Sequence, residues 1–375
     1  MRSLFAGSTS ASWLATLAPV IEVDRDQARA FRLAGQHLHR RTDPLTAVAA
    51  CGIQESPPGW WGVALHARAM GEPGPEEVLM VNAMRGAPHV VPKADAPVFT
   101  TALVPGDDGA LKGLVGSLAA KEVTGAGHTV REAVDLVVGA ARVGLGGGPL
   151  GRDDFHQAMR ERLPDTLLPW CRGCQSHHVR PGLWRALGPL GVTVMPEKAT
   201  YALAKQPRMA VPEARAELVR RFLRCFGPAT HTQLASWAQT APAHAKTLFA
   251  AVDDELEPAK VDGRRGFVLA EDVPRLEHPP AAKGIRLLGG FDSYVSQPDR
   301  DALSPGKELR KRMFPAVGRP GVVLYEGELR GLWKGRKKAD RLDLEVEWLG
   351  KPVDIADEAE AIAPLRGCAT TRLIG

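Results

Sequence analysis

Three polar residues, Gln54, Glu55 and Ser56, stand between an apolar run and two consecutive prolines. A glutamine amide both donates and accepts hydrogen bonds, so it can hold a water molecule in place although it is not a base. A neighbouring carboxylate can polarise that water or stabilise a developing cation. The triplet can therefore orient a hydrolytic water against an electrophilic carbon. The alternative is structural, because Ser56 followed by Pro57 is a standard helix start.

A second group of reactive residues lies in the stretch CRGCQSHH, residues 171–178. Cysteine and histidine are ordinary zinc ligands, but the ligand pairs of most structural sites are a dozen or more residues apart. We therefore expect a tight loop with two free thiols and no metal. A zinc site built from Cys171, Cys174 and His178 with a remote fourth ligand is the alternative.

The bulk properties are those of a globular protein. Of the 375 residues, 44% are hydrophobic and 24% are charged, and the formal net charge is +5. Five cysteines do not form a disulfide framework, which favours a reducing cytoplasm. No apolar run approaches the ~18 residues of a membrane helix. We interpret the Ser/Thr-rich N-terminus as a leader into the fold and not as a signal peptide, and we expect no membrane partner.

The region from 211 to 269 has the clearest domain signature. An amphipathic helix over 211–226 is followed by a Gly-Pro turn, and Thr230 is a suitable N-cap for the next helix. A third helix follows Pro242, and two short strands are joined around Asp262 and Gly263, a hairpin turn signal. Three helices and a hairpin are the layout of a winged helix-turn-helix.

The same order of elements recurs twice upstream. A Gly-Pro turn also occurs at 148–149, and its separation from the turn at 227–228 shows that the repeat has the size of a domain. In the first copy we expect helices at 25–41, 43–51 and 56–70 and a wing at 78–92, so that the triplet lies between the second and third helices.

From residue 284 onward the pattern changes to strands. We therefore expect an α+β fold with three tandem winged helix-turn-helix motifs followed by a small C-terminal β-barrel. The expected divisions are the first unit with its leader, the second unit, the third unit and the barrel: 1–125, 126–210, 211–283 and 284–375.

Three winged units with basic clusters indicate binding to double-stranded DNA, because such folds present helices and wings to grooves and phosphates. Protein–protein modules are the alternative for the same fold. His89, on the first wing, contacts DNA near the triplet or is a hydrogen-bonded, half-buried imidazole. The expected DNA contacts are Arg40, Arg41, Arg68, Arg85, His89, Arg264 and Arg265.

Several of these stretches are similar to those of the AlkZ/YcaQ-like family of bacterial winged-helix DNA glycosylases. They are GIQ, RGAPHVVP, WCRGCQSHHV, RRFLRCFGPAT, DGRRGFVLA and LLGGFDSYV. The resemblance covers roughly residues 25–373 and implies a monomer that closes as a C around the duplex. It also implies excision of bulky N7-alkylated purines and interstrand cross-links, in some members as protection of an antibiotic producer against its own product.

The catalytic element of this family is a Gln-x-Gln or Gln-x-Asp triplet whose polar pair positions the attacking water. Gln54 matches its first position, whereas Ser56 stands at the second and Glu55 replaces a residue that is usually apolar. Either Glu55 supplies the carboxylate from the adjacent position, or the protein only binds DNA as a regulator or lesion sensor. We expect the first: a monofunctional DNA glycosylase that uses Gln54, Glu55 and Ser56 and needs no metal or cofactor.

Overall fold

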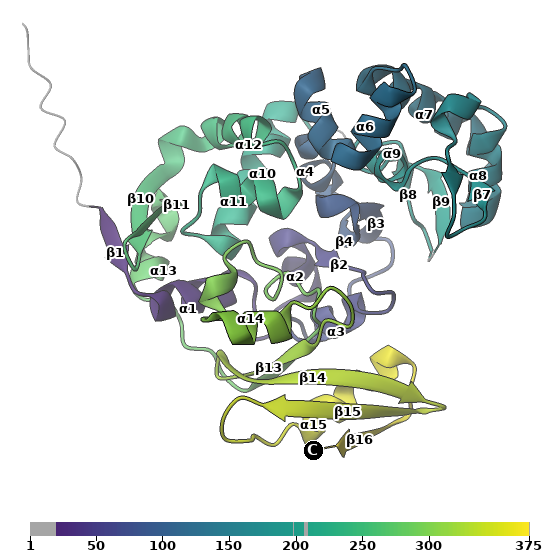
Figure 1. Cartoon of the computed structure of the whole chain (residues 1–375). Coiled ribbons are helices and arrows are strands. Elements are labelled where there is room, and N and C mark those ends of the chain that lie inside the picture. Colours follow the sequence, from purple (N-terminus) through teal and green to yellow (C-terminus); the bar gives the residue numbers. More distant parts are fainter. Residues whose placement is uncertain (1–19, 198, 206–208, 375) are drawn as a thin grey trace, which may run out of the picture.

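The computed structural model describes residues 20–197, 199–205 and 209–374, and it is an α+β protein as predicted (Figure 1). The leader expected at the N-terminus lies largely outside the described residues. Within the described part of the chain, no helix has both the length and the apolar content needed to cross a bilayer.

Residues 211–269 contain the predicted order of elements. The capping box between Thr230 and Gln233 starts the second helix, as expected from the sequence. The hairpin turn has positive φ at Asp262 (48°) and Gly263 (77°), which a two-residue turn of this type requires. The elements are α10 (Val211–Phe226), α11 (His231–Ala238), α12 (Pro242–Phe249), β10 (Leu256–Val261) and β11 (Arg264–Leu269).

Residues 21–99 also follow the predicted order, with two shortened helices. The helix expected over 25–41 is α1 and ends at Gly35. The helix expected over 56–70 is α3 and begins only at Trp61, because the two prolines and the left-handed Gly59 (φ 81°) delay it. A short strand containing Gln54 is added to the wing. The elements are β1 (Ile21–Val23), α1 (Arg25–Gly35), α2 (Pro44–Cys51), β2 (Ile53–Gln54), α3 (Trp61–His66), β3 (Val78–Asn82), β4 (Pro88–Pro92) and α4 (Ala96–Phe99).

The middle of the chain is mainly helical and has its own core around Phe155 and Trp184. Two helices here, α5 and α6, are not expected from the sequence, although Asp107 is the N-cap of the first. The elements are α5 (Asp108–Val115), α6 (Ser117–Gly125), α7 (Val130–Gly144), β5 (Leu150–Gly151), α8 (Arg152–Arg160), β6 (Trp170–Cys171), β7 (Ser176–His177), α9 (Pro181–Ala186), β8 (Thr193–Val194) and β9 (Thr200–Leu203).

The C-terminal strands form an open sheet, which corrects the expected β-barrel. Its order is β12-β13-β14-β15-β16, and among the described residues the edge strands β12 and β16 do not pair with each other. The last pair, β15 with β16, is parallel and is connected through α15. The elements are α13 (Val273–Glu277), β12 (Ile285–Leu288), α14 (Lys307–Met313), β13 (Gly321–Tyr325), β14 (Glu328–Lys338), β15 (Arg341–Trp348), α15 (Ala356–Ile362) and β16 (Thr370–Ile374).

Burial on both faces explains why the sheet does not close. Leu332 belongs to a core that it shares with Leu33 of α1, whereas its neighbour Trp333 belongs to a core with Val63 of α3 and Ile362 of α15. Successive residues of a strand point to opposite faces. Other elements therefore cover each face of the sheet, so its apolar side chains are buried without closure into a barrel.

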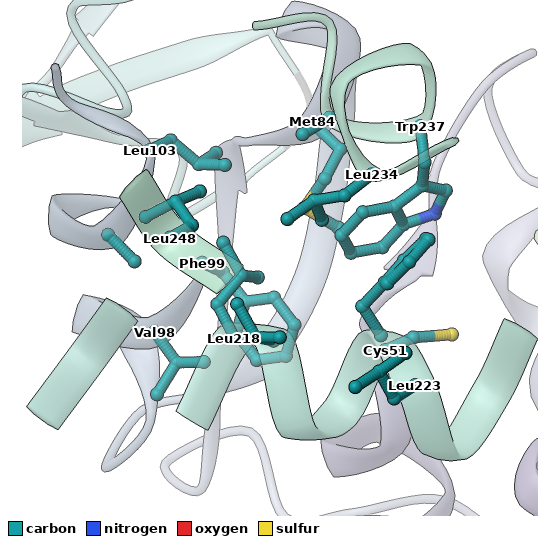
Figure 2. Packing of buried hydrophobic residues seen from close by; sticks show 14 of the residues in the cluster. Cys51, Met84, Val98, Phe99, Leu103, Leu218, Leu223, Leu234, Trp237 and Leu248 are labelled. Atoms are coloured by element: carbon teal, nitrogen blue, oxygen red, sulfur yellow. The ribbon is translucent and has the colours of Figure 1, made fainter. Parts of the chain in front are cut away.

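One core joins the first and third predicted units (Figure 2). Phe99 and Cys51, from the N-terminal part of the chain, lie in the same cluster as Phe222 of α10 and Trp237 of α11. In addition, β1 pairs in parallel with β10. The four predicted divisions and their winged-helix character stay predictions, but the first and third share their hydrophobic packing.

Candidate active site

Gln54 occupies the end of β2, beside the first wing. The strand pairs antiparallel with β4, and Gln54 lies opposite His89. Directly opposed residues of an antiparallel pair project their side chains from the same face. Gln54 and His89 are 35 positions apart in the sequence, and their side chains are thus cross-strand neighbours.

Arg85 fixes the amide of Gln54. Its Nη2 donates to Oε1 of Gln54 at 2.6 Å, and its Nη1 donates to the carbonyl oxygen of Trp237, at the end of α11, at 2.8 Å. A guanidinium only donates, so the bonded atom of Gln54 must be its oxygen. Burial lowers the pKa of Arg85 to about 10, with a smaller effect from the charge of Arg319. Arg85 is therefore still cationic near neutral pH.

The backbone at Arg85 is unusual. The residue lies in the 3-10 turn η1 (Met84–Gly86) with φ 58° and ψ 18°, a left-handed conformation that residues with a side chain rarely adopt. Such conformations persist where the surroundings impose them, and they concentrate at functional sites. The two hydrogen bonds of the guanidinium and the core contacts of Met84 provide that constraint here.

His89 is a hydrogen-bonded imidazole, and it is fully buried and not half-buried as the structural alternative expects. Its side chain is in hydrogen-bond contact with the carbonyl oxygen of Ala87 through Nδ1 at 2.8 Å. Because a carbonyl only accepts, Nδ1 carries the proton and Nε2 is left as the acceptor. Burial and, next, the charge of Arg85 lower the pKa of His89 to about 3. His89 is not a cationic contact for phosphate.

Glu55 caps α3. Its carboxylate accepts hydrogen bonds from the backbone N–H groups of Gly59, Trp60 and Trp61, the last two at 3.0 Å. A carboxylate at a helix N-terminus satisfies otherwise unpaired N–H groups and interacts favourably with the helix dipole. The helix-start function assigned to Ser56 as the structural alternative belongs to Glu55.

Ser56 is half-buried in the same loop. We find no hydrogen bond of its hydroxyl among the residues that the structure describes, and the same holds for Nε2 of Gln54. These groups remain able to bind water or substrate, whereas both oxygens of Glu55 are engaged by backbone donors.

The C-terminal region supports the loop that carries Glu55. Arg366 donates from Nη1 to the carbonyl oxygen of Gly59 at 2.9 Å, and its guanidinium lies 4.4 Å above the ring of Trp60. Trp60 in turn packs against Trp333 of the sheet, with ring centroids 5.6 Å apart. Arg366 lies more than 300 positions from this loop, and no local signal in the sequence indicates the contact.

A cleft of about 340 Å³ opens on the other side of Arg85. Its lining includes Arg85 and Gly86, Arg180 and Arg185 from α9 and the segment before it, and Gln239 after α11. The cleft therefore lies where the three predicted units meet. Gln54, Glu55 and Ser56 do not line it, so Arg85 separates the triplet from the cleft.

Arg68 is buried and paired within the protein. Its guanidinium makes two hydrogen bonds of 2.7 Å to the carboxylate of Asp292, and both side chains are buried. Although burial alone would lower the pKa of Arg68, the Asp292 carboxylate raises it. The stretch LLGGFDSYV thus supplies the counter-ion of a buried pair.

Arg41 is half-buried and also engaged within the protein. It forms an ion pair with Glu358 of α15 and donates from Nε to the carbonyl oxygen of His66. Its role in the structure is to join α3 to the C-terminal region.

The other three arginines are accessible. Arg40 and Arg265 are exposed. Arg264 is exposed and makes an ion pair of 3.2 Å with Asp301. These three residues stay predicted phosphate contacts.

The Cys-x-x-Cys stretch lies in the hairpin of β6 and β7. The ligand atoms of Cys171, Cys174 and His178 lie within 4.8 Å of one another. All five cysteines are free.

Comparisons with known proteins agree with this architecture. Residues 48–366 match the family described as DNA glycosylase AlkZ-like. The chain is 27% identical over 336 residues to a protein of Streptomyces sahachiroi named interstrand DNA cross-link repair glycosylase, covering 82% of this chain and 87% of the relative. The solved structure of Streptomyces sahachiroi DNA glycosylase AlkZ superposes with a TM-score of 0.71 at 22% identity, covering 94% of this chain and all of that one.

Proposed function

Because the chain belongs to the AlkZ-like DNA glycosylase family and is therefore a DNA glycosylase of DNA repair, we propose that it hydrolyses the N-glycosidic bond of bulky N7-alkylated purines in duplex DNA. The observation that carries the proposal is the 2.6 Å hydrogen bond between Arg85 and Gln54. It holds the first residue of the catalytic triplet in one orientation beside the wing.

The chemistry places modest demands on the enzyme. Alkylation at N7 makes the purine cationic, so the electron pair of the C1′–N9 bond leaves with the base and neutralises it. The deoxyribose is left as an oxocarbenium-like cation. Water then bonds to C1′ and loses its proton to solvent. The protein needs to place that water and to stabilise the cationic sugar.

Gln54 is suited to placing the water. One lone pair of its Oε1 accepts from Arg85, and the second is available to accept from a water O–H. The Nε2 hydrogens can donate to the water oxygen or to the nucleic acid. Arg85 acts as a positioning residue in this scheme, because it removes the freedom of the amide to rotate.

Glu55 acts in this proposal through the loop and through its charge. The carboxylate is held at the start of α3 by three backbone donors, so contact with the attacking water would require it to give up one of them. From its position at the start of α3, the carboxylate stabilises the oxocarbenium ion only over a distance. Ser56 is then the second polar group near Gln54.

The interface and the biological setting are parts of the same proposal. The exposed Arg40, Arg264 and Arg265 contact phosphates of the duplex, and the protein acts in the cytoplasm as a monomer. The name of the Streptomyces relative supports interstrand cross-links as a second substrate class. Protection of a producing cell against its own DNA-alkylating product is a further part of the proposal.

The test is base release from duplex DNA that carries N7-alkylguanine adducts of graded size, and from a cross-linked duplex. Wild type is compared with Gln54→Ala, Glu55→Gln and Ser56→Ala. We expect wild type to release the base, with a preference that increases with the size of the adduct. Base release should be almost lost in Gln54→Ala.

A DNA-binding protein without activity would give another pattern. None of the adducts would be released, while salt-sensitive duplex binding by wild type and all three variants would stay intact. That result would reject the proposed substrate class and would leave lesion sensing or regulation as the function.

A further inference from the structure

The β6–β7 hairpin, in the middle of the chain, brings together chemistry that the glycosylase site does not use. Trp170 pairs with His177 and Cys171 with Ser176, and the chain turns between the two strands with Gln175 in the left-handed region (φ 51°). The turn returns the second cysteine to the first, and His178 follows directly after the hairpin. Three soft ligands that are close in the sequence are thereby also close in space.

The ligand atoms are close enough for one metal ion to bind all three after a small shift. The Sγ atoms of Cys171 and Cys174 and a ring nitrogen of His178 all lie within 4.8 Å of one another. Zn–S bonds of about 2.3 Å in a tetrahedron place two sulfurs about 3.8 Å apart. Closing the site therefore needs a shift of about 1 Å at most, in a turn whose cysteine side chains are accessible.

His178 presents the nitrogen that a metal requires. Its Nδ1 lies 2.7 Å from the carbonyl oxygen of Val179, which can only accept, so Nδ1 carries the proton. Its Nε2 is buried and has no hydrogen-bond partner among the described residues. Histidines that bind metals ordinarily donate the other ring nitrogen to a carbonyl or carboxylate in this way.

We propose that Cys171, Cys174 and His178 bind one zinc ion, with the fourth coordination position open to water. The donor set of two thiolates and one imidazole selects zinc over the hard cations that prefer oxygen ligands. The ion ties the hairpin to its flanking segment and stabilises the middle region of the fold. This site is independent of the glycosylase proposal, because it shares no residue with Gln54, Arg85 or their partners.

The experiment measures metal on the full-length protein, purified without chelator under reducing conditions. The zinc content, measured by elemental mass spectrometry, should be about one equivalent per chain in wild type. It should be less than a tenth of that in Cys171→Ser and in Cys174→Ser. His177→Ala is the matched control on the same hairpin, because His177 lies outside the cluster. Cys368→Ser is the control for a buried cysteine elsewhere. Both controls should keep the full equivalent.

Cobalt replacement gives a second measurement on unmutated protein, so the test does not depend on the variants folding. One equivalent of Co²⁺ added to the metal-free protein should produce thiolate-to-metal charge-transfer absorption and the visible bands of a four-coordinate ion, both displaced by zinc. Removing the metal should also lower the Tm by several degrees, since a bound ion stabilises only the folded state.

Three outcomes would overturn the proposal. The first is zinc content that is unchanged in the two cysteine variants. The second is metal-free wild type that takes up neither zinc nor cobalt at micromolar concentrations after full reduction. The third is purification of the pair as a Cys171–Cys174 disulfide that binds no metal once it is reduced, which would assign redox chemistry to this hairpin.

Discussion

The guanidinium of Arg85 donates a 2.6 Å hydrogen bond to the amide oxygen of Gln54, across 31 positions of sequence. The same guanidinium bonds to the carbonyl oxygen of Trp237 at the end of α11. The orientation of the candidate catalytic amide therefore depends on packing between the N-terminal elements and the segment 211–269. Activity in this protein should be sensitive to that contact even when DNA binding is not.

Replacing either residue of this pair should slow base release. We expect Gln54→Ala to lower kcat on the order of 10²-fold, as does loss of one oriented hydrogen-bonding group in other active sites. Arg85→Met should lower kcat by a smaller factor with little change in KM, and Arg85→Lys should recover only part of it because lysine lacks the planar fork. Single-turnover kinetics with saturating enzyme measure the rate. Equal losses of kcat and of DNA affinity in Arg85→Met would contradict a positioning role.

The two interpretations of Glu55 separate in a pair of variants. As a cap of α3, Glu55→Ala should lower the free energy of unfolding by about 1 kcal/mol, and Glu55→Gln should cost less because its amide oxygen still accepts one backbone hydrogen bond. Base release should then follow folded stability. A fall of 10²-fold or more in Glu55→Gln, at an unchanged Tm, would instead show that the negative charge stabilises the cationic sugar directly and not only over a distance.

Removing either Arg68 or Asp292 alone should strongly destabilise the protein. Removing one member of a buried pair leaves an uncompensated charge and typically costs about 3–5 kcal/mol. We expect Arg68→Met to show a loss of this size in urea unfolding, and the double variant Arg68→Met/Asp292→Leu to lose clearly less. Arg264→Ala is the control, because the exposed pair of Arg264 with Asp301 should contribute at most about 1 kcal/mol. Equal losses at the buried and exposed pairs would refute this ranking.

Stability should fall as the pH decreases below about 6.5. The folded-state pKa of His89 is lowered to about 3 and that of His37 to about 4, in both cases mainly by burial. An unfolded histidine has a pKa near 6.5, so between these values the unfolded chain binds protons that the folded chain does not, and unfolding is favoured. The effect is absent above pH 6.5 and is complete below about pH 3. Urea unfolding at pH 7.5, 6.0 and 5.0 should show the decline.

His89→Asn should reduce the pH dependence of unfolding. The buried imidazole contributes at most about 1.4 kcal/mol per pH unit to the slope, and asparagine does not titrate. His128→Asn is a suitable control because His128 is only half-buried and its contact with Thr166 is at the surface. An identical slope in wild type and His89→Asn would show that His89 does not carry this dependence.

The hairpin arginines should set the salt dependence of DNA binding. If Arg264 and Arg265 each neutralise a phosphate, the double alanine variant should weaken binding and reduce the slope of log K against log salt by about 0.9 per lost contact. The double lysine variant should keep the slope, since lysine also neutralises phosphate. Fluorescence anisotropy at several salt concentrations measures both. An unaltered slope in the alanine variant would place the DNA elsewhere on the protein.

Local sequence signals determined much of the architecture. The Gly-Pro turn, Thr230 and the Asp262–Gly263 pair act within a few residues of one another, and the elements between 211 and 269 follow the predicted order. Gln54 is a candidate because its amide and the two prolines that follow Ser56 are visible in the sequence. The compact Cys171–His178 stretch is likewise local, and its ligand atoms are brought together by a single turn.

Tertiary structure decided what depends on distant partners. Arg68 has the same side chain as the exposed Arg40, and only the presence of Asp292 beside it makes Arg68 part of a buried ion pair. Glu55 became a cap because the loop bends its carboxylate onto α3, while Arg366, from the end of the chain, holds that loop. The C-terminal strands form an open sheet because other elements cover both faces. Hydrophobic periodicity indicates that one face of an element is buried, but it does not indicate which other element covers that face.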